Sequence, residues 1–338
     1  MDDTALNRVL AALPPTPSAD DYRHIAHQLL PYIQAEVPAM GEGESLERLR
    51  FLMQVARRDL GLARIIEGHL DATQILYEAR HPLHDESLYG IWASGGPADS
   101  TQIDHDSPTG SGKLLGSKPF CSGSDIVDRA LVYIYSSEQL IDIDMRSAAA
   151  ESRLHFEAEH WKAPAFAETH TWTVAFDSLL VRPTQRIGQP RWYFERPGFC
   201  LGALAPAACW AGGAFGLVDH VRQQTLKNGH AKAHLGAMVA ATTSMRTMLA
   251  WGAERIDADP GNDGGHLFPT ALLVRHHIER GCADILDRFG RTLGPRPLAF
   301  DAENARRVSE LSLYMRQCHA ESDLEELGVH LEKHPGFP

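Results

Sequence analysis

Hydrophobic positions repeat with the period of a helix near both ends of the chain and with the period of a strand in the middle. Apolar residues recur at three-and-four spacing through residues 51–75 and again through 271–289. Between Leu88 and Pro190 the period shortens toward two, as in 171–176, where large and small residues alternate. The two changes of period predict a mainly α-helical protein with a central antiparallel β-domain.

The same changes of period set the predicted domain limits. We expect a helical N-terminal domain over residues 1–86, a β-domain over 87–192 and a helical bundle over 193–338. The run 197–218 is long and apolar enough to cross a bilayer, but it consists largely of Ala and Gly and contains Pro206. Small residues let helices approach closely, so this run is predicted as a buried bundle helix and no membrane span is expected.

Composition narrows the class of protein. A chain of 338 residues with 43% hydrophobic and 22% charged residues is typical of a soluble globular protein. The net charge of −12 comes without a basic block, which argues against nucleic acid as a partner. Five cysteines without C-x-x-C spacing indicate neither a disulfide framework nor a zinc ribbon, and the N-terminus lacks a signal sequence. A cytoplasmic location is predicted.

Eighteen histidines raise the question of a metal site. The densest groups are Asp104-His105-Asp106 and His276-His277, and neither has the spacing of known metal ligands. No metal site is predicted.

The segment from Gly112 to Ile134 carries the clearest chemical signal. It has the pattern of one strand, an irregular turn at Ser122-Gly123-Ser124 and a second strand, with Phe120 just before the turn. Hydroxyl groups beside an aromatic ring suit a flat cofactor with polar edges. An ordinary hairpin whose loop is capped by serines would have the same pattern.

Several segments resemble the acyl-CoA dehydrogenase family. The run Gly116–Gly123, followed by Asp128 and Arg129, is similar to the family's flavin-contacting strand. Further similarity is found in the segments Leu88–Gly95, Arg196–Phe199 and Tyr314–Leu324. The resemblance implies an N-terminal helical domain, here shortened, a β-barrel middle domain and a C-terminal four-helix bundle. It also implies FAD as the cofactor and an acyl-CoA or similar small molecule as the substrate.

The resemblance assigns cofactor contacts to particular residues. The flavin would lie against Trp92, Ser94, Phe120 and Ser122, and Arg291 could reach its pyrophosphate. The family's Arg-x-x-Phe-Gly string is replaced here by Gln224–His230. This departure predicts FAD binding that is weak, altered or lost.

The resemblance also implies a catalytic base, for which two main positions stay open. Alignment of the C-terminal segment places His319 where most members have Glu, and a shift of two residues would bring in Glu321. Other members have the base at the start of the first bundle helix, where Glu195 stands here beside Arg196, a candidate substrate-binding residue. Glu195 could instead stabilise the helix start through the helix dipole.

Three functions therefore remain as hypotheses. The first is FAD-dependent oxidation of the CH–CH group of an acyl thioester, with a separate electron acceptor. The second is a flavin-dependent monooxygenase or oxidase of the same fold, and the third is a catalytically silent binding or scaffold subunit. In each case we expect a homodimer or homotetramer assembled through the C-terminal helices.

Overall fold

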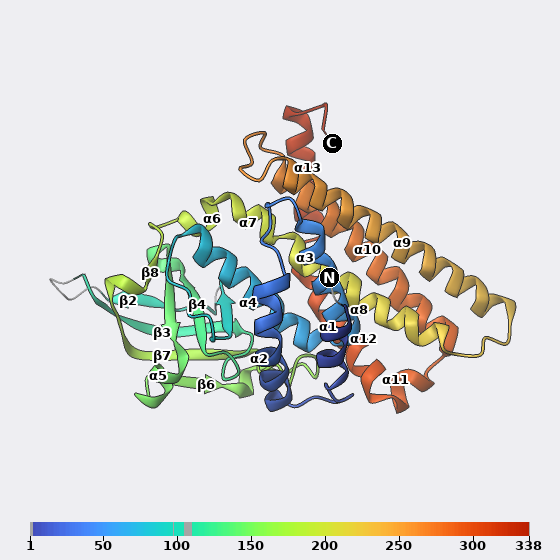
Figure 1. Ribbon diagram of the computed structural model, residues 1–338, viewed down its shortest axis with the longest axis horizontal. Helices are drawn as coiled ribbons and strands as arrows, with labels where there is room; N and C mark the ends of the chain where they lie inside the picture. The colour runs from blue at the N-terminus through green and yellow to red at the C-terminus, as the bar shows by residue number, and fades with distance from the viewer. Residues whose placement is uncertain (1–2, 97, 105–109, 338) are drawn as a thin grey trace. The chain divides into compact units, whose positions relative to one another are not determined.

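The structure, a computed structural model, describes residues 3–96, 98–104 and 110–337. Along these residues the helix, sheet, helix order predicted from the sequence is confirmed (Figure 1). Residues 105–109 lie outside the described residues. They include His105 and Asp106 of the Asp104-His105-Asp106 group.

The chain forms two compact units. The sheet unit comprises residues 3–33 and 65–199, and the bundle unit comprises residues 34–64 and 200–337. The predicted domain limits at 86 and 192 follow the order of helices and strands along the chain. The compact units instead divide the first helices between them, so the predicted limits stay predictions. These helices are α1 (Asp3–Ala11), α2 (Ala19–Glu36), α3 (Ser45–Arg58) and α4 (Leu60–Glu78).

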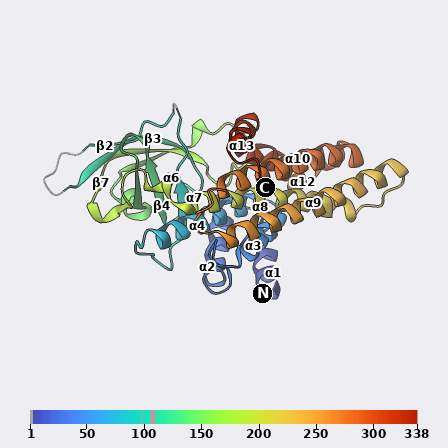
Figure 2. The same ribbon diagram turned by 90° about the horizontal axis from the view of Figure 1, so that it is seen from above.

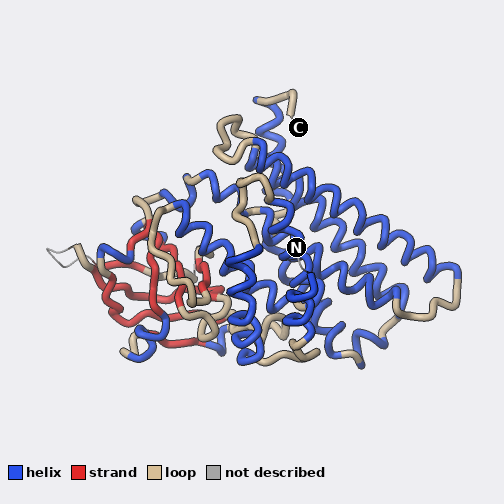
Figure 3. The backbone as a smooth tube through the Cα atoms, viewed as in Figure 1, coloured by secondary structure: helices blue, strands red, loops and turns tan. Residues whose placement is uncertain are grey.

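The strands form two four-stranded sheets within the sheet unit (Figure 3). One has the order β1-β4-β5-β8 and the other the order β2-β3-β7-β6. All pairs are antiparallel except β1 with β4, which run parallel. The strands are β1 (Tyr89–Trp92), β2 (Gln102–Asp104), β3 (Gly112–Cys121), β4 (Arg129–Ile134), β5 (Gln139–Asp144), β6 (Leu154–Glu157), β7 (Trp172–Val181) and β8 (Arg186–Ile187).

Strand β4 shows why the middle of the chain is so apolar. Its residues from Ala130 to Ile134 are all buried, so this strand is covered on both faces and reads as a continuous hydrophobic run. Leu131 and Tyr133 pack against Ile75 and Leu76 of α4. Helix α4 therefore covers one face of the first sheet.

The bundle unit is built around a helix of small residues, α8 (Leu204–Arg222). A Cβ atom added at Gly212 would lie 2.9 Å from the Met53 Cα, and one at Gly216 would lie 2.8 Å from the Arg57 carbonyl oxygen. Glycine at these positions therefore lets the backbones of α8 and α3 approach closely. The long helices α9 and α10 lie side by side in the same unit (Figure 2). The remaining bundle helices are α7 (Pro197–Gly202), α9 (Gly229–Ala258), α10 (Leu267–Leu293), α11 (Arg296–Phe300), α12 (Ala302–Tyr314) and α13 (Glu321–Lys333).

One helical stretch, Pro197–Arg222, is long and apolar enough by composition to cross a membrane. In the fold, 78% of its most apolar window is buried, and α8 packs against α3, α9 and α10. This burial agrees with the predicted core helix of a bundle.

Candidate functional site

The candidate site in the sheet unit begins with a break in the pairing of β3 with β7. The register shifts between Lys118 and Cys121, so Pro119 and Phe120 bulge out of the ladder. Proline has no N–H to donate, which suits an unpaired position. Phe120 adopts a φ of +58° and leaves 56% of its surface exposed. A bulky residue held in the left-handed region is strained, and such strain is found most often at functional sites.

A second aromatic ring stands beside Phe120. The indole of Trp161 meets the Phe120 ring edge to face, with centroids 6.0 Å apart and planes at 89°. The Trp161 Nε1 donates to the Ala165 carbonyl oxygen at 2.9 Å, which fixes the orientation of the indole. The two rings form an apolar wall of defined shape.

A chain of hydroxyl groups adjoins this wall. The hydroxyls of Thr169 and Thr171 are 3.0 Å apart, and Thr171 donates to the Ser122 Oγ at 3.1 Å. Thr169 and Thr171 are buried and Ser122 is half-buried, so the chain runs from the interior toward the surface.

Trp92 and Ser94 hold the bulge from behind. The buried Trp92 donates from Nε1 to the Ser122 carbonyl oxygen at 3.1 Å. Ser94 donates from Oγ to the Pro119 carbonyl oxygen at 2.8 Å. The structure thus brings together the four residues predicted as flavin contacts, two at the surface and two supporting them. Their role toward a flavin stays a prediction.

A buried charge reinforces the same strand. Lys118 is fully buried, and its Nζ donates to Asp99 at 2.6 Å and to the Tyr133 carbonyl oxygen at 2.7 Å. Burial lowers the pKa of Lys118, and the hydrogen bond to Asp99 opposes that effect. This pair fastens β3 to β4 directly beside Phe120.

Glu195 and Arg196 are neighbours in sequence but have different surroundings. The side chain of Glu195 is 61% exposed and accepts from Arg191 Nε at 2.9 Å. Arg196 is buried, and it pairs with Glu78 at 2.8 Å and Asp71 at 3.5 Å. Burial opposes the charge on Arg196, but these two carboxylates hold its pKa above the usual value. The geometry gives Arg196 an anchoring role within the sheet unit.

His319 and Arg291 belong to the bundle unit. His319 lies in the loop before α13, with 75% of its side chain exposed and its Nδ1 3.3 Å from Asp323. Its backbone N–H donates to the same carboxylate at 3.0 Å. Arg291, in the last turn of α10, pairs with Asp287 at 2.9 Å. Their predicted roles toward substrate and flavin remain untested.

Three residues of the site had not been predicted: Trp161, Thr169 and Thr171. The sequence Thr169-His170-Thr171-Trp172 carries a signal that could have found the threonines, because two hydroxyls stand two residues apart, next to aromatic residues, directly before the strand that begins at Trp172. Trp161 lies in an irregular segment, where side-chain direction cannot be read from a period.

No family model matches the chain, and no curated protein does. Solved structures match over most of its length. TdsC from Paenibacillus sp. A11-2, a dibenzothiophene monooxygenase in complex with FMN and indole, superposes with a TM-score of 0.76 at 15% identity, covering 95% of this chain and 91% of that one. The methanesulfinate monooxygenase MsuC from Pseudomonas fluorescens gives 0.73 at 17% identity, covering 99% and 94%. Butyryl-CoA dehydrogenase from Megasphaera elsdenii gives 0.74 at 13% identity, covering 92% and 89%.

These matches show the fold. The chain has the acyl-CoA dehydrogenase fold that the sequence resemblance implied, and that prediction is confirmed. The same fold carries monooxygenation in some of these proteins and dehydrogenation in another, so the choice of reaction depends on the side chains.

Proposed function

We propose, from this fold and from the exposed, strained Phe120, that the protein is a flavin-dependent oxidoreductase. The observation that carries the proposal is the bulge that presents Phe120 beside Trp161 and the hydroxyl of Ser122. An apolar surface bordered by hydroxyl groups fits an isoalloxazine ring. A bound flavin would supply the redox chemistry, either by accepting a hydride or by activating molecular oxygen.

FMN suits the chain better than FAD. The string that contacts the adenosine diphosphate half in the family is replaced here, and Arg291 is held by Asp287. FMN lacks the adenosine monophosphate part of FAD, so it needs no contacts to an adenosine or a pyrophosphate. TdsC was solved with FMN, which supports the choice.

Monooxygenation is the reaction that the side chains support best. Dehydrogenation of an acyl thioester requires a carboxylate base at the substrate, whereas the usual position of that base carries His319. An imidazole can take up or release a proton near neutral pH, and this is a suitable property next to a substrate that gains an oxygen atom. Two of the similar structures are monooxygenases.

Acyl thioester dehydrogenation is the second candidate, and Glu195 favours it. This carboxylate is exposed to solvent and beside a bundle helix start, as in family members whose base lies there. Glu195 would take the proton from the substrate, with a separate protein as electron acceptor. In both candidates we place the protein in the cytoplasm with a small-molecule substrate and no nucleic-acid partner.

Flavin titration of the purified protein tests the proposal. We expect FMN binding to quench flavin fluorescence, and Phe120→Ala with Ser122→Ala to weaken it at least tenfold. Leu180→Ala is the matched control, because Leu180 is a similarly exposed apolar residue of β7. Equal FMN affinity in the double variant and the wild type would exclude this flavin site. A protein that binds neither FMN nor FAD would fit the silent scaffold subunit instead.

Anaerobic mixing with butyryl-CoA separates the two reactions. The dehydrogenase bleaches its flavin under these conditions, whereas the monooxygenase does not. Bleaching in the wild type would therefore overturn the monooxygenase proposal in favour of the second candidate.

A further inference from the structure

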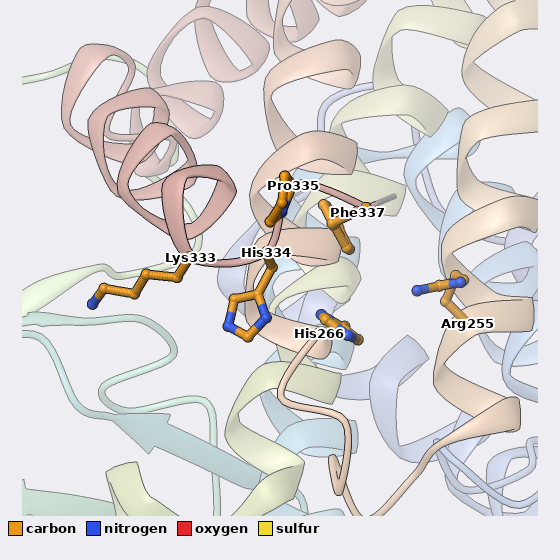
Figure 4. Close-up of a pocket in the computed structure, with 7 residues that line it drawn as sticks. Arg255, His266, Lys333, His334, Pro335 and Phe337 are labelled. Carbon is orange, nitrogen blue, oxygen red and sulfur yellow. The ribbon is translucent and has the colours of Figure 1, made fainter.

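A cationic cavity lies within the bundle unit, where the C-terminal segment meets the connection between α9 and α10. Its volume is about 460 Å³. Figure 4 shows the side chains that line it. Arg255 from the end of α9, His266 before α10, and Lys333 and His334 at the end of α13 supply its polar lining. Phe337, Pro335 and Gly336 complete the wall.

Three histidines crowd together at this cavity. His266 Nδ1 is 3.4 Å from His330 Nε2, and the rings of His330 and His334 stack with centroids 4.4 Å apart. Burial lowers the pKa of His330, and His334, His266 and Lys333 lower it further. Protonation of His330 is therefore unfavourable until negative charge arrives.

Aromatic rings orient the side chain of Arg255. Its guanidinium lies 5.9 Å from the centroids of both Trp251 and Phe337, and the Phe337 ring stacks on His266 at 5.4 Å. These contacts fix the position of the cation without neutralising it. The N–H groups of a guanidinium match the oxygens of a phosphate group.

Another polar cavity of the bundle unit provides a comparison. It contains Arg57, Arg58 and Arg307, and each of these pairs with a carboxylate, from Asp219 or Glu303. That cavity neutralises its own charge.

The cationic cavity has no carboxylate in its described lining. The nearby loop acid Asp259 already accepts from the backbone N–H groups of Asp263 and Gly264. Within the described part of the chain, no group of three or more His, Cys, Asp or Glu side chains is arranged to hold a metal ion. An anion is therefore the ligand class that fits.

We propose that this cavity binds the phosphate group of a small molecule, with Arg255 as the principal contact and His330 of the adjoining histidine cluster taking up a proton as it binds. The volume exceeds what one phosphate needs and falls in the range of small-molecule sites. The phosphate could belong to a free metabolite or to a larger ligand such as coenzyme A. The proposal stands on the bundle unit alone and does not depend on the flavin site.

Calorimetric titration with inorganic phosphate and with coenzyme A tests the proposal and distinguishes the two sources. Arg255→Gln should weaken phosphate binding at least tenfold. Arg246→Gln is the matched control, because Arg246 lies on the same helix over another ring, that of Phe215, and should bind as the wild type does. Tighter binding of coenzyme A than of phosphate, lost in Arg255→Gln, would identify the larger ligand.

Inorganic sulfate isolates the role of the histidines, because its charge is constant between pH 6.5 and 8.0. We expect at least fivefold tighter binding at pH 6.5, with net proton uptake, and a smaller pH effect in His330→Gln. Arg255→Gln binding phosphate as tightly as Arg246→Gln would overturn the proposal. So would a wild-type protein that binds zinc at this cluster but neither oxyanion.

Discussion

Asp59 and Glu310 share the guanidinium of Arg306 in the interior of the bundle unit. Arg306 lies 2.6 Å from the Asp59 carboxylate and 3.1 Å from that of Glu310, and both carboxylates are buried. Burial and the charge of Asp59 raise the pKa of Glu310 to about 7, although Arg306 opposes this. One cation thus serves two acids, and Glu310 becomes hard to ionise.

This relationship predicts stability that falls as pH rises. The pKa of Glu310 is higher in the folded state than its ordinary value of 4.5, so between about pH 4.5 and pH 7 the folded protein binds more protons than the unfolded one. Glu310→Gln should remove this loss of stability, which is on the order of 2 to 3 kcal/mol in the free energy of unfolding. Urea unfolding at several pH values measures the free energy of unfolding of both proteins. Glu303→Gln, on the same helix, should keep the wild-type slope.

Phe120→Gly should separate backbone strain from ligand binding. Glycine adopts a φ of +58° without strain, so the free energy of unfolding should rise by about 1 kcal/mol, while FMN affinity should fall at least tenfold with the ring removed. Thermal unfolding and flavin titration measure the two effects. Phe120→Ala keeps the strain and should lose affinity without gaining stability; a gain in both variants would contradict the interpretation.

Arg196→Gln should destabilise the protein by about 3 to 5 kcal/mol, because Asp71 and Glu78 would lose their buried partner. Urea unfolding checks this. Arg191→Gln, at an exposed position with surface ion pairs, should leave the stability close to that of the wild type. A folded Arg196→Gln protein of wild-type stability would return Arg196 to the candidate substrate-binding residues.

Glu195→Gln should leave stability within about 0.5 kcal/mol of the wild type and leave flavin content unchanged, because the side chain is exposed and paired only at the surface. Its effect on catalysis depends on the reaction. If the wild type bleaches with butyryl-CoA, loss of bleaching in Glu195→Gln and its survival in His319→Gln would make Glu195 the base. The reverse pattern would assign the base to His319.

We expect a homo-oligomer assembled through the long bundle helices. Met248 and Trp251 of α9 and Leu273 of α10 line a largely apolar surface cavity of about 590 Å³. Met248→Glu should therefore shift the mass measured by light scattering toward the monomer at micromolar concentration. A monomeric wild type would contradict the expectation, and Arg246→Gln should leave the mass unchanged.

Much of the fold could be predicted because hydrophobic periodicity records burial directly. The position of Phe120 was also predictable from its run of neighbours. Its backbone twist was not, because the bulge arises from pairing with β7, a strand about fifty residues further along the chain. The parallel pairing of β1 with β4 has the same kind of long-range origin.

Ion pairs were the least predictable part of the site. Arg196 as a substrate contact stays a prediction, and the sequence carries no sign of its ion pair with Glu78, 118 residues away. Lys118 carried no sign in the sequence that Asp99 would neutralise it within the interior. Local patterns describe which face of an element is buried, but they do not contain the partner of a buried charge.

The close approach of α3 and α8 at Gly212 and Gly216 has a consequence for how the protein is made. Helix α3 leaves the ribosome about 150 residues before the glycines that receive it, and the whole sheet unit from residue 65 is synthesised in between. Contacts so distant in sequence form late and slow folding. The apolar side of α3 therefore stays exposed to solvent while the sheets assemble. The nascent chain, rather than the finished protein, is then the form most in need of a chaperone.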